Sequence, residues 1–380
     1  IRLSLVGSEM CIRDSLHIGK IVNEINMLSD QKYILNEILD IIKKEKPNGV
    51  LIAGDVYDKS VPSAEAVELY DNFITRLAEL DTAVYIISGN HDSPERLGFC
   101  SRLIRSGNIF VDAVFNGKAN KHTLCVNSKN VNIYTLPFIK PANVKAFYGG
   151  EINDYTQAVK TVLENTEIDK NAVNILVAHQ FVTGTGTAVR ADSENVSVGG
   201  VDNVDAAVFA DFDYVALGHL HTRQSAARNV AYCGTPLKYS SSECSGKKCA
   251  VMVEIDGKDI STREIPLVPM RDMRIIKGTL RELTDAPQGN TDDYIFAVLT
   301  DEAEPIDPMG SLRSVYPNIM SLRFDNRRSK SNADIQLAKI TNKTPVQLFE
   351  EFYEMQNNIE LTKEQADLVK SIFACMEEEQ

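Results

Sequence analysis

Four short apolar runs in this chain share one pattern, because each ends in Gly or Ala and is followed at once by polar residues. They read GVLIAGDVYD (49–58), AVYIISGNHD (83–92), VNILVAHQF (173–181) and DYVALGHLH (213–221). Runs of this length, rich in Val and Ile, predict buried β-strands. In open sheets with helices alongside, functional groups gather just beyond the strand ends. We therefore expect the polar residues after these runs to form one site.

Helical patterns alternate with these runs. Ser29 is expected to cap a helix whose apolar face is Ile34, Leu35, Ile38, Leu39 and Ile42, and Pro47 ends it. Ser63 is expected to open a second helix, with Val67, Tyr70, Phe73, Ile74 and Leu77 facing inward. Ser93 and Pro94 form a favoured N-cap and first-turn pair. The alternation predicts a layered α/β core.

The second half of the chain has a different pattern. Residues 249–256 and 261–268 predict paired strands around the turn DGKD. A new unit is expected from about Met270, with strands in 293–302 and 319–324 and a helix in 309–316, followed by a polar linker. Capping boxes at Thr344 and Thr362 predict two terminal helices. These helices either pack on their own chain or bind a partner, and the pattern does not decide between the two.

Composition narrows the class of protein. The net charge of −13 argues weakly against a surface that binds nucleic acid all over, although bound cations would offset acidic groups locally. The basic clusters Lys247, Lys248 and Arg327, Arg328, Lys330 are interpreted as solvated loops. Seven scattered cysteines without C-x-x-C spacing favour reduced thiols in a cytoplasmic protein. Neither a membrane helix nor a signal peptide is predicted.

The polar residues at the strand ends are metal ligands by type. Carboxylate, amide oxygen and imidazole groups suit Mn²⁺ or a similar ion, and the lack of cysteine among them argues against structural zinc. With a bridging acid, such a set can hold two ions ~3.5–4 Å apart, the separation used for phosphoester hydrolysis. Asn90 would supply a neutral oxygen ligand, which leaves His91 for the substrate. Asp92 is expected to hydrogen-bond His91 and favour its charged form. His122 lies in no such segment and is expected to be structural.

The order of these segments resembles the calcineurin-like metallophosphoesterases, whose motifs are D-x-H, G-D-x-x-D, G-N-H-D/E, H and G-H-x-H. GNHDSPER, VAHQFV, YCGTPLKYS, PMRDMRIIKG and DPMGSLRSVYPNIMSLRF are similar, more narrowly, to the bacterial SbcD group of nuclease subunits. The resemblance runs from about residue 16 to 380. It implies an α/β fold, a layered β-sandwich flanked by helices, with a small α+β capping domain and a C-terminal helical pair.

The same resemblance implies a function. It implies a nuclease that uses two Mn²⁺ ions, or Mg²⁺ or another divalent ion, to hydrolyse DNA. Activity would be 3′–5′ exonuclease on double strands and endonuclease on single strands and hairpins, in DNA replication, recombination and repair. The implied partners are DNA, a coiled-coil ATPase of the SbcC type, and a second copy of this chain within a heterotetramer.

Site roles and domain limits also follow from the resemblance, position by position. One ion would be held by His17, Asp55 and His221, and the other by Asp55, Asn90, His179 and His219. His91 would contact the scissile phosphate or protonate the leaving oxygen, Asp92 would support it, and Asp58 would brace its loop. The implied domains are a nuclease domain over 16–269, a capping domain over 270–330, and a linker with partner-binding helices over 331–380.

The start of the chain departs from the family pattern. The family has Asp two residues before its first His, but here Ser15 takes that place before His17. Asp14 would point to the opposite face of an extended strand. GSEMCIRD is also a poor apolar strand, and LSLVGSEMCIRDS is similar to adapter sequence. We therefore expect residues 1–15 to be a non-native leader. The alternative is a genuine chain with a weakened first metal site.

Two other functions stay open. The chain could be a metallophosphoesterase for a nucleotide or a phosphoprotein, although the additional unit after Met270 and the capped helices are not needed for a small substrate. It could also be an inactive scaffold for the ATPase, because Ser15 removes a ligand. Metal-dependent DNA degradation separates these possibilities from the nuclease.

Overall fold

The computed structural model describes residues 8–13, 15–126, 129–184, 190–194 and 202–326, and ten single residues: 347, 349, 350, 353, 361, 362, 365, 366, 368 and 369. Asp14, the cluster at 327–330 and most of the two predicted terminal helices lie outside these residues. The chain divides into two compact units. The first is Ile1–Ile275 with Asp292–Phe296, and the second is Ile276–Thr291 with Ala297–Gln380.

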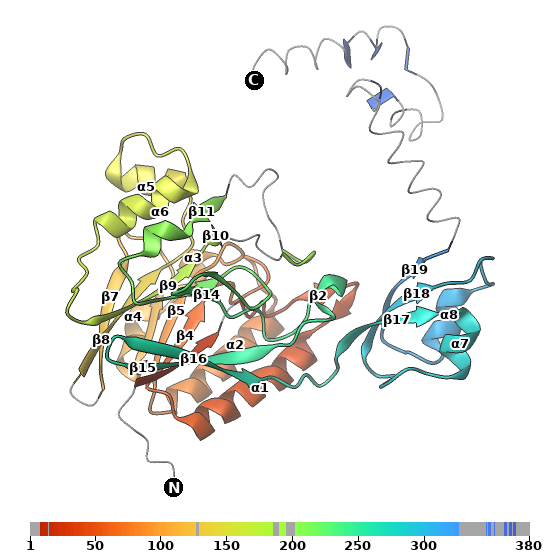
Figure 1. Cartoon of the computed structure of the whole chain (residues 1–380), viewed down its shortest axis with the longest axis horizontal. Helices are drawn as coiled ribbons and strands as arrows, with labels where there is room; N and C mark the ends of the chain where they lie inside the picture. Colours follow the sequence, from red (N-terminus) through yellow and green to blue (C-terminus); the bar gives the residue numbers. More distant parts are fainter. Residues whose placement is uncertain are drawn as a thin grey trace. The chain divides into compact units, whose positions relative to one another are not determined.

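Two six-stranded sheets form the first unit (Figure 1). The first sheet has the order β16-β15-β1-β4-β5-β6, in which β1, β4, β5 and β6 are parallel and β15 and β16 are antiparallel. Its strands are β1 (Ser8–Arg13), β4 (Gly49–Ala53), β5 (Ala83–Ile87), β6 (Ile109–Asp112), β15 (Cys249–Asp256) and β16 (Asp259–Pro266).

The second sheet has the order β13-β14-β12-β9-β8-β7, with β8, β9, β12 and β14 parallel. Its strands are β7 (Asn120–Val126), β8 (Lys129–Leu136), β9 (Val173–His179), β12 (Tyr214–Gly218), β13 (Gln224–Ala227) and β14 (Val230–Tyr232). The four apolar runs thus become β4, β5, β9 and β12, as predicted.

The two sheets pack face to face because their central strands are apolar on both faces. Side chains alternate along a strand, so Ile175 and Val177 of β9 point one way and Leu176 and Ala178 the other. Ile175 and Val177 join a core with Leu51 of β4 and others between the sheets. Leu176 and Ala178 join a second core on the outer face of the second sheet. Burial on both faces fixes the strand register.

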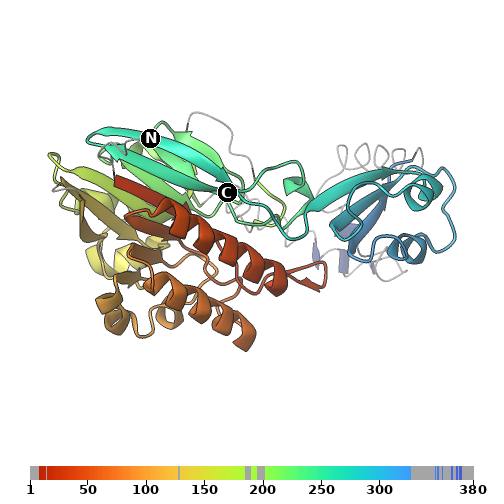
Figure 2. The same cartoon turned by 90° about the horizontal axis from the view of Figure 1, so that it is seen from below.

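Helices cover the outer faces. The first sheet is flanked by α1 (Leu28–Glu45) and α2 (Ala64–Ala78), which lie side by side in Figure 2. The second core includes residues of α5 (Pro141–Tyr148), α6 (Tyr155–Glu164) and η2 (Ala206–Phe209). Shorter elements are β2 (Ile21–Val22), β3 (Ile25–Asn26), α3 (Pro94–Leu97), α4 (Ser101–Ile104), η1 (Arg105–Gly107), β10 (Phe181–Thr183), β11 (Asn203–Asp205) and η3 (Ser241–Glu243).

Helix starts agree with the sequence in two of three cases. Ser63 caps α2 by accepting from the amide of Ala66, and Ser93 is the N-cap residue of α3 with Pro94 in the first turn. The prediction for α1 was wrong. Met27 is the N-cap residue without a side-chain bond, and Ser29 lies inside the first turn. Asn26 instead accepts a hydrogen bond from the amide of Leu28 at 2.9 Å.

The segment judged a poor strand nevertheless forms β1, inside the first sheet. It pairs in parallel with β4, from Met10 beside Gly49 to Arg13 beside Ile52, and antiparallel with β15. Met10 is fully buried in the core between the sheets. Backbone hydrogen bonds to β4 and β15 therefore hold this segment as a strand, although its sequence has only a weak apolar pattern. This strand leads directly to Ser15 and His17.

The second unit contains helices on a small sheet. β17 (Met273–Gly278) and β18 (Tyr294–Leu299) pass from the first unit into the second, and with β19 (Ile319–Phe324) they form a sheet in the order β17-β18-β19. α7 (Leu280–Asp285) and α8 (Pro308–Arg313) contact each other. Tyr316 is buried and donates from its hydroxyl to the carbonyl of Leu283. The strands and helix predicted after Met270 are present.

Candidate metal centre

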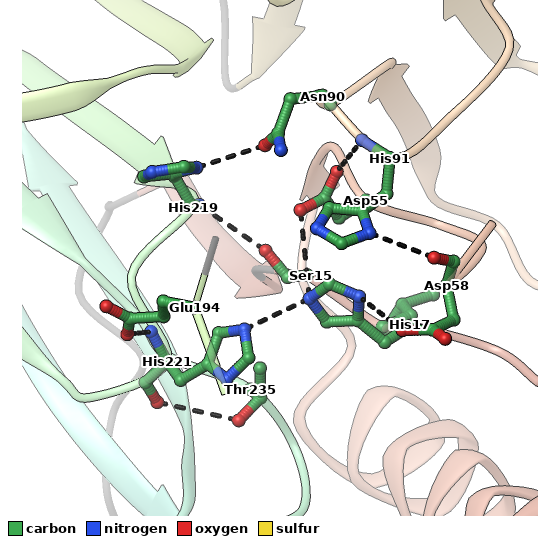
Figure 3. Close-up of polar contacts among 12 residues, drawn as sticks. Ser15, His17, Asp55, Asp58, Asn90, His91, Glu194, His219, His221 and Thr235 are labelled. Carbon is green, nitrogen blue, oxygen red and sulfur yellow. Dashed lines mark hydrogen bonds and ion pairs between the residues drawn. The ribbon is translucent and has the colours of Figure 1, made fainter. Parts of the chain in front are cut away.

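The predicted site residues gather where the parallel strands of both sheets end (Figure 3). Asp55 follows β4, Asn90 and His91 follow β5, His179 ends β9, and His219 and His221 follow β12. His17 follows β1. Parallel strands place their carboxyl ends along one edge, so the first sheet contributes one half of the site and the second sheet the other.

Two glycines let the loops after β4 and β5 approach each other. Gly54 has φ +90°, and a Cβ atom there would lie 2.5 Å from His179 Nδ1 and 2.8 Å from the Gly89 amide nitrogen. A Cβ atom on Gly89 would overlap the Asp55 carboxylate. Only glycine fits both positions, because the backbone itself forms the wall behind the carboxylate.

Three of the predicted ligands have a left-handed backbone. The φ angles are +48° at His17, +44° at Asp55 and +108° at His219. This conformation is unfavourable for residues with a Cβ atom, and each such residue costs of order 1–3 kcal/mol. Strain of this kind concentrates at functional sites, where the surrounding fold holds it in place. The backbone of His17 is held by hydrogen bonds to the Asp55 carbonyl at 2.8 Å and from Gln31 Nε2 at 2.6 Å.

Asp55 lies at the centre of the site and is fully buried. Its Oδ2 atom is 3.7 Å from His17 Nε2 and 3.3 Å from His179 Nε2, while Oδ1 accepts a hydrogen bond from the His91 amide at 2.9 Å. Burial alone would raise the pKa of Asp55, but His179 and His17 hold that pKa well below its usual range. One carboxylate oxygen therefore faces two imidazoles that come from different sheets.

On one side of Asp55, two imidazoles contact the amide oxygen of Asn90. Asn90 Oδ1 is 2.9 Å from His179 Nε2 and 3.0 Å from His219 Nδ1. Burial, with His179 nearby, lowers the pKa of His219 to about 3. His219 is therefore neutral at physiological pH and available as a ligand.

On the other side of Asp55, two imidazoles face each other. His17 Nε2 and His221 Nε2 are 3.1 Å apart, and both rings are buried. Burial lowers the pKa of His17 to about 4, although Asp58 and Asp55 act in the opposite direction. The structure thus brings together the residues expected to hold the first ion, next to those expected to hold the second.

The donor set fits a divalent cation. Nδ1 of His179 lies 2.7 Å from the carbonyl oxygen of Ala53, which can only accept, so this nitrogen carries the proton. In the neutral ring Nε2 then has a lone pair, and it faces Asp55 Oδ2 and Asn90 Oδ1. Three electron-rich atoms this close repel one another unless a positive ion lies between them. Hard oxygen and imidazole ligands suit Mn²⁺, Mg²⁺ or a similar ion.

His91 is oriented by a backbone carbonyl. Its Nδ1 atom lies 2.9 Å from the carbonyl oxygen of Asp58, and its ring meets that of His17 edge-on at a centroid distance of 4.9 Å. His91 is only half-buried, unlike the other imidazoles of the site. Its Nε2 atom lacks a hydrogen-bond partner among the described residues, which leaves it available for a substrate.

Asp58 contacts two side chains that lie outside its own loop. Its carboxylate binds Lys20 Nζ at 2.8 Å and lies 3.5 Å from His17 Nδ1. Burial would raise the pKa of Asp58, but the hydrogen bonds with His17 and Lys20 lower it to about 2. His17, Asp58 and His91 also each offer a ligand atom within 4.8 Å of the others, an arrangement that could itself hold a metal ion.

The expected hydrogen bond between Asp92 and His91 is absent among the described contacts, and this prediction was wrong. Asp92 instead accepts the amides of Val56 at 3.1 Å, Tyr57 at 2.9 Å and Gly89 at 2.9 Å. Burial and the charge of Asp55 raise the pKa of Asp92 to about 6, against these amides. Asp92 therefore joins the loops that carry Asp55 and His91 and does not touch the His91 ring.

Ser15 occupies the position at which the family pattern has Asp. It is fully buried, and its hydroxyl accepts a hydrogen bond from the His219 amide at 3.4 Å. Figure 3 shows it between the backbone of His219 and the side chains of His17 and Asp55. The chain thus presents a neutral oxygen where a carboxylate would add a negative charge.

The sequence did not reveal the residues that form hydrogen bonds to the backbone of the ligand residues. Tyr239 and Gln31 bind the backbone around His17, and Glu194 Oε1 accepts the His221 amide at 2.6 Å. Lys248 was interpreted as solvated, which is wrong, because only 10% of its side chain is exposed and it binds Glu243 at 2.6 Å. Glu243 lies three residues after the end of YCGTPLKYS, but no ligand-like spacing marks it.

The residues expected to be structural lie outside this site. His122 Nε2 binds Asp112 Oδ2 at 2.5 Å, and its ring packs on Tyr85 and Phe110. Five of the described cysteines are not joined in disulfides: Cys100, Cys125, Cys233, Cys244 and Cys249. None of the described helices is long and apolar enough to cross a membrane.

Comparisons with known proteins show the family to which the chain belongs. Residues 16–223 match the calcineurin-like phosphoesterase family, and residues 269–357 match the type 5 capsule protein repressor C-terminal domain. The chain belongs to the calcineurin-like phosphoesterase family, and within it to the group of SbcD nuclease subunits. It is a metal-dependent hydrolase with nuclease activity. The predicted α/β fold class is confirmed, while most of the predicted C-terminal helical pair lies outside the described residues.

Two curated relatives show how far the similarity extends. The SbcD subunit of the SbcCD nuclease of Staphylococcus saprophyticus is 32% identical over 374 residues, which are 96% of this chain and 97% of the relative. Its counterpart in Staphylococcus epidermidis is 33% identical over 370 residues, 94% of this chain and 96% of the relative. Among solved structures, a dimetal phosphatase from Danio rerio aligns over 69% of this chain and 99% of its own, with a TM-score of 0.39 and 11% identity.

Proposed function

We propose that this protein hydrolyses DNA phosphodiester bonds with two divalent metal ions, Mn²⁺ by preference. The observation that carries the proposal is the central place of Asp55 Oδ2, which lies 3.7 Å from His17 Nε2 and 3.3 Å from His179 Nε2. A single carboxylate oxygen between two sets of neutral ligands is the arrangement expected of a bridging ligand.

The residues divide into two ligand sets around that oxygen. His17, Asp55 and His221 would hold one ion, and Asp55, Asn90, His179 and His219 the other. When bound, the ions would supply Lewis acidity toward the phosphoryl group and the attacking water. The protein contributes a buried set of imidazoles, and lowered pKa values keep two of them, His17 and His219, in the neutral form.

His91 is proposed as the residue that acts on the substrate. Its Nδ1 atom is engaged with the Asp58 carbonyl, and its ring is more exposed than those of the other site imidazoles. With Nδ1 held, Nε2 would contact the scissile phosphate or deliver a proton to the leaving oxygen. Asp92 supports this role indirectly, because it binds the backbone of the loop that carries His91.

The two staphylococcal relatives, both SbcD subunits of the SbcCD nuclease, supply the biological context for the proposal. We assign nuclease activity to residues 16–269, presentation of DNA to 270–330, and binding of an SbcC-type ATPase to 331–380. The enzyme would act in DNA recombination, replication and repair. Its activity would be 3′–5′ exonuclease on double strands and endonuclease on single strands and hairpins. The working form would be a homodimer within a heterotetramer.

The deciding experiment measures DNA degradation by the full chain. Linear duplex, single-stranded and hairpin DNA are incubated with Mn²⁺, with Mg²⁺ or with chelator, in the presence and absence of an SbcC-type ATPase. We expect cleavage that depends on Mn²⁺ and rises with the ATPase. Hydrolysis of a nucleotide or phosphoprotein with intact DNA would favour a phosphatase instead, and binding of the ATPase without any hydrolysis would favour a scaffold.

A further inference from the structure

A chain of hydrogen bonds leads from His221 away from the metal ligands. His221 Nδ1 lies 2.8 Å from Ser193 Oγ, and that hydroxyl lies 2.8 Å from Oε1 of Glu243. The direct distance from His221 Nδ1 to Glu243 Oε1 is 3.6 Å. The serine hydroxyl is therefore placed between an imidazole nitrogen and a carboxylate oxygen.

Only one assignment of donors and acceptors fits these hydrogen bonds. An ionised carboxylate only accepts, so Ser193 gives its single proton to Glu243. Ser193 can then only accept from His221, and His221 must carry a proton on Nδ1. In the neutral ring this leaves the lone pair on Nε2, the atom that lies 3.1 Å from His17 Nε2.

Glu243 is held in its charged form by its surroundings. Only 1% of its side chain is exposed, and Lys248 Nζ binds Oε2 at 2.6 Å. Ser240 Oγ and the Tyr239 amide also donate to Oε1, at 3.0 and 3.2 Å. A buried carboxylate with a lysine partner and several donors remains ionised. Although burial opposes it, the pKa of Glu243 lies well below its usual range because of His221 and Lys248.

Lys248 also holds the backbone of His221. Its Nζ atom donates to the His221 carbonyl oxygen and to Thr235 Oγ1, both at 2.8 Å. The same lysine therefore neutralises Glu243 and fixes the residue whose ring Glu243 orients. Removing one partner of a buried ion pair costs free energy. The contacts of Lys248 with Glu243 and with the His221 carbonyl are therefore expected to persist.

We propose that Glu243 is a positioning residue of the metal centre, which acts through Ser193 to keep the proton of His221 on Nδ1 and its Nε2 atom turned toward the ion. Lys248 completes the arrangement by fixing Glu243. The inference rests on the proposed role of His221 as a ligand. Carboxylates behind metal-binding histidines are a general means of fixing ring orientation and basicity, and their loss costs about 10- to 100-fold in metal affinity.

The His17 side of the site has a matching arrangement. His17 Nδ1 lies 3.5 Å from Asp58 Oδ1, and Asp58 binds Lys20 at 2.8 Å. Each imidazole of the facing pair thus has a carboxylate behind Nδ1 and a lysine behind the carboxylate. The two Nε2 atoms lie 3.1 Å apart, which is close enough for one cation to be bound by both rings.

The test is Mn²⁺ binding to the full chain by calorimetry, with Glu243→Gln, His221→Ala and the control Glu254→Gln. Glu254 carries the same group on β15, but 44% of its side chain is exposed and it pairs with Arg263. The amide of Gln at 243 can donate to Ser193, which reverses the hydrogen bonds and moves the His221 proton to Nε2. We expect Glu243→Gln to bind one of two ions about 10- to 100-fold more weakly, His221→Ala to lose that ion, and Glu254→Gln to match the parent chain.

A second readout distinguishes positioning from structural support. The ¹⁵N chemical shifts of His221 in the metal-free chain report which nitrogen carries the proton. We expect Nδ1 in the parent chain and Nε2 in Glu243→Gln, whereas a purely structural role would change the melting temperature alone. If Glu243→Gln does not fold, the double variant Glu243→Gln with Lys248→Met removes both charges, and the same criteria apply to it.

The outcomes separate this inference from the proposed function. Parent-like affinity and an Nδ1 proton in the Gln variant, together with loss of an ion in His221→Ala, would overturn the positioning role and leave the metal centre intact. Two ions bound normally by His221→Ala would overturn the ligand assignment and the positioning role with it.

Discussion

Nδ1 of His179 binds the carbonyl oxygen of Ala53 at 2.7 Å, and this hydrogen bond joins the end of β9 to the end of β4. The two strands belong to different sheets. The bond therefore fixes the second half of the site against the first, and it selects the tautomer that turns His179 Nε2 toward Asp55. Because the acceptor is a backbone atom, no side-chain substitution at position 53 removes it.

Replacing Asp55 with Asn should empty both ion sites. The change keeps the shape of the side chain but removes the negative charge that faces His17 and His179. We expect Mn²⁺ affinity to fall more than about 100-fold at both sites, beyond the loss typical of a supporting residue. Calorimetry of the metal-free chain measures this, with Asp40→Asn on α1 as the exposed control. Full occupancy of one ion would show that Asp55 does not bridge.

Replacing His91 with Ala should leave metal binding intact and reduce cleavage. His91 contacts the Asp58 carbonyl and is not in either proposed ligand set. Loss of a general acid typically costs about 10²- to 10⁴-fold in rate. Mn²⁺ stoichiometry and DNA hydrolysis should be measured on the same preparation. Since His17, Asp58 and His91 could also form a metal site, loss of an ion in this variant would assign His91 to the ligands instead.

Replacing Ser15 with Asp should strengthen one ion site. Ser15 is buried between His17 and His219, so a carboxylate there adds an anionic oxygen to the first ligand set. We expect Mn²⁺ to bind about tenfold more tightly at one site, which corresponds to about 1.4 kcal/mol, and DNA cleavage to become faster. Ser15→Asn is the matched control, since it adds similar volume without charge. Equal gains in both variants would exclude charge as the cause.

The metal-free chain should become less stable as the pH falls below 6.5. Burial lowers the pKa values of His17 and His219 to about 4 and about 3, so the unfolded chain binds protons that the folded chain does not. Stability present above pH 6.5 is then lost as the pH falls toward those values, by up to about 2.7 kcal/mol per pH unit for the two residues. Asp92 and Glu194 act in the opposite direction, because their pKa values are raised.

Urea unfolding with chelator at pH 7, 6 and 5 measures this dependence. We expect the net loss of unfolding free energy to be smaller than the value calculated for His17 and His219, because Asp92 and Glu194 offset part of it. His219→Asn should reduce the slope with pH by roughly half of the two-histidine value. An unfolding free energy that stays constant from pH 7 to 5 would contradict the lowered histidine pKa values.

The strands that carry the site could be predicted because they are buried on both faces. Continuous apolar runs such as 49–53 and 173–177 predict buried strands. The polar residues that follow these runs identify Asp55 and His179 as site residues. Contacts between distant segments could not be predicted in the same way. Asp92 binds amides 35 and 36 positions away, and Ser193 reaches Glu243 across 50 positions. The burial of Lys248 likewise depends on a partner that only the folded chain brings near.

The left-handed backbone at His17, Asp55 and His219 has a consequence for metal exchange. Because folding alone imposes these unfavourable conformations, the ligands are already preorganised when an ion arrives, and binding need not reshape the loops. Ion loading and folding thus become separate events. Chelation should strip the centre without unfolding the chain, and adding a different divalent metal should reconstitute it directly. The free metal concentrations in the cell, rather than the ion present when the chain folded, would then decide which ion the enzyme carries.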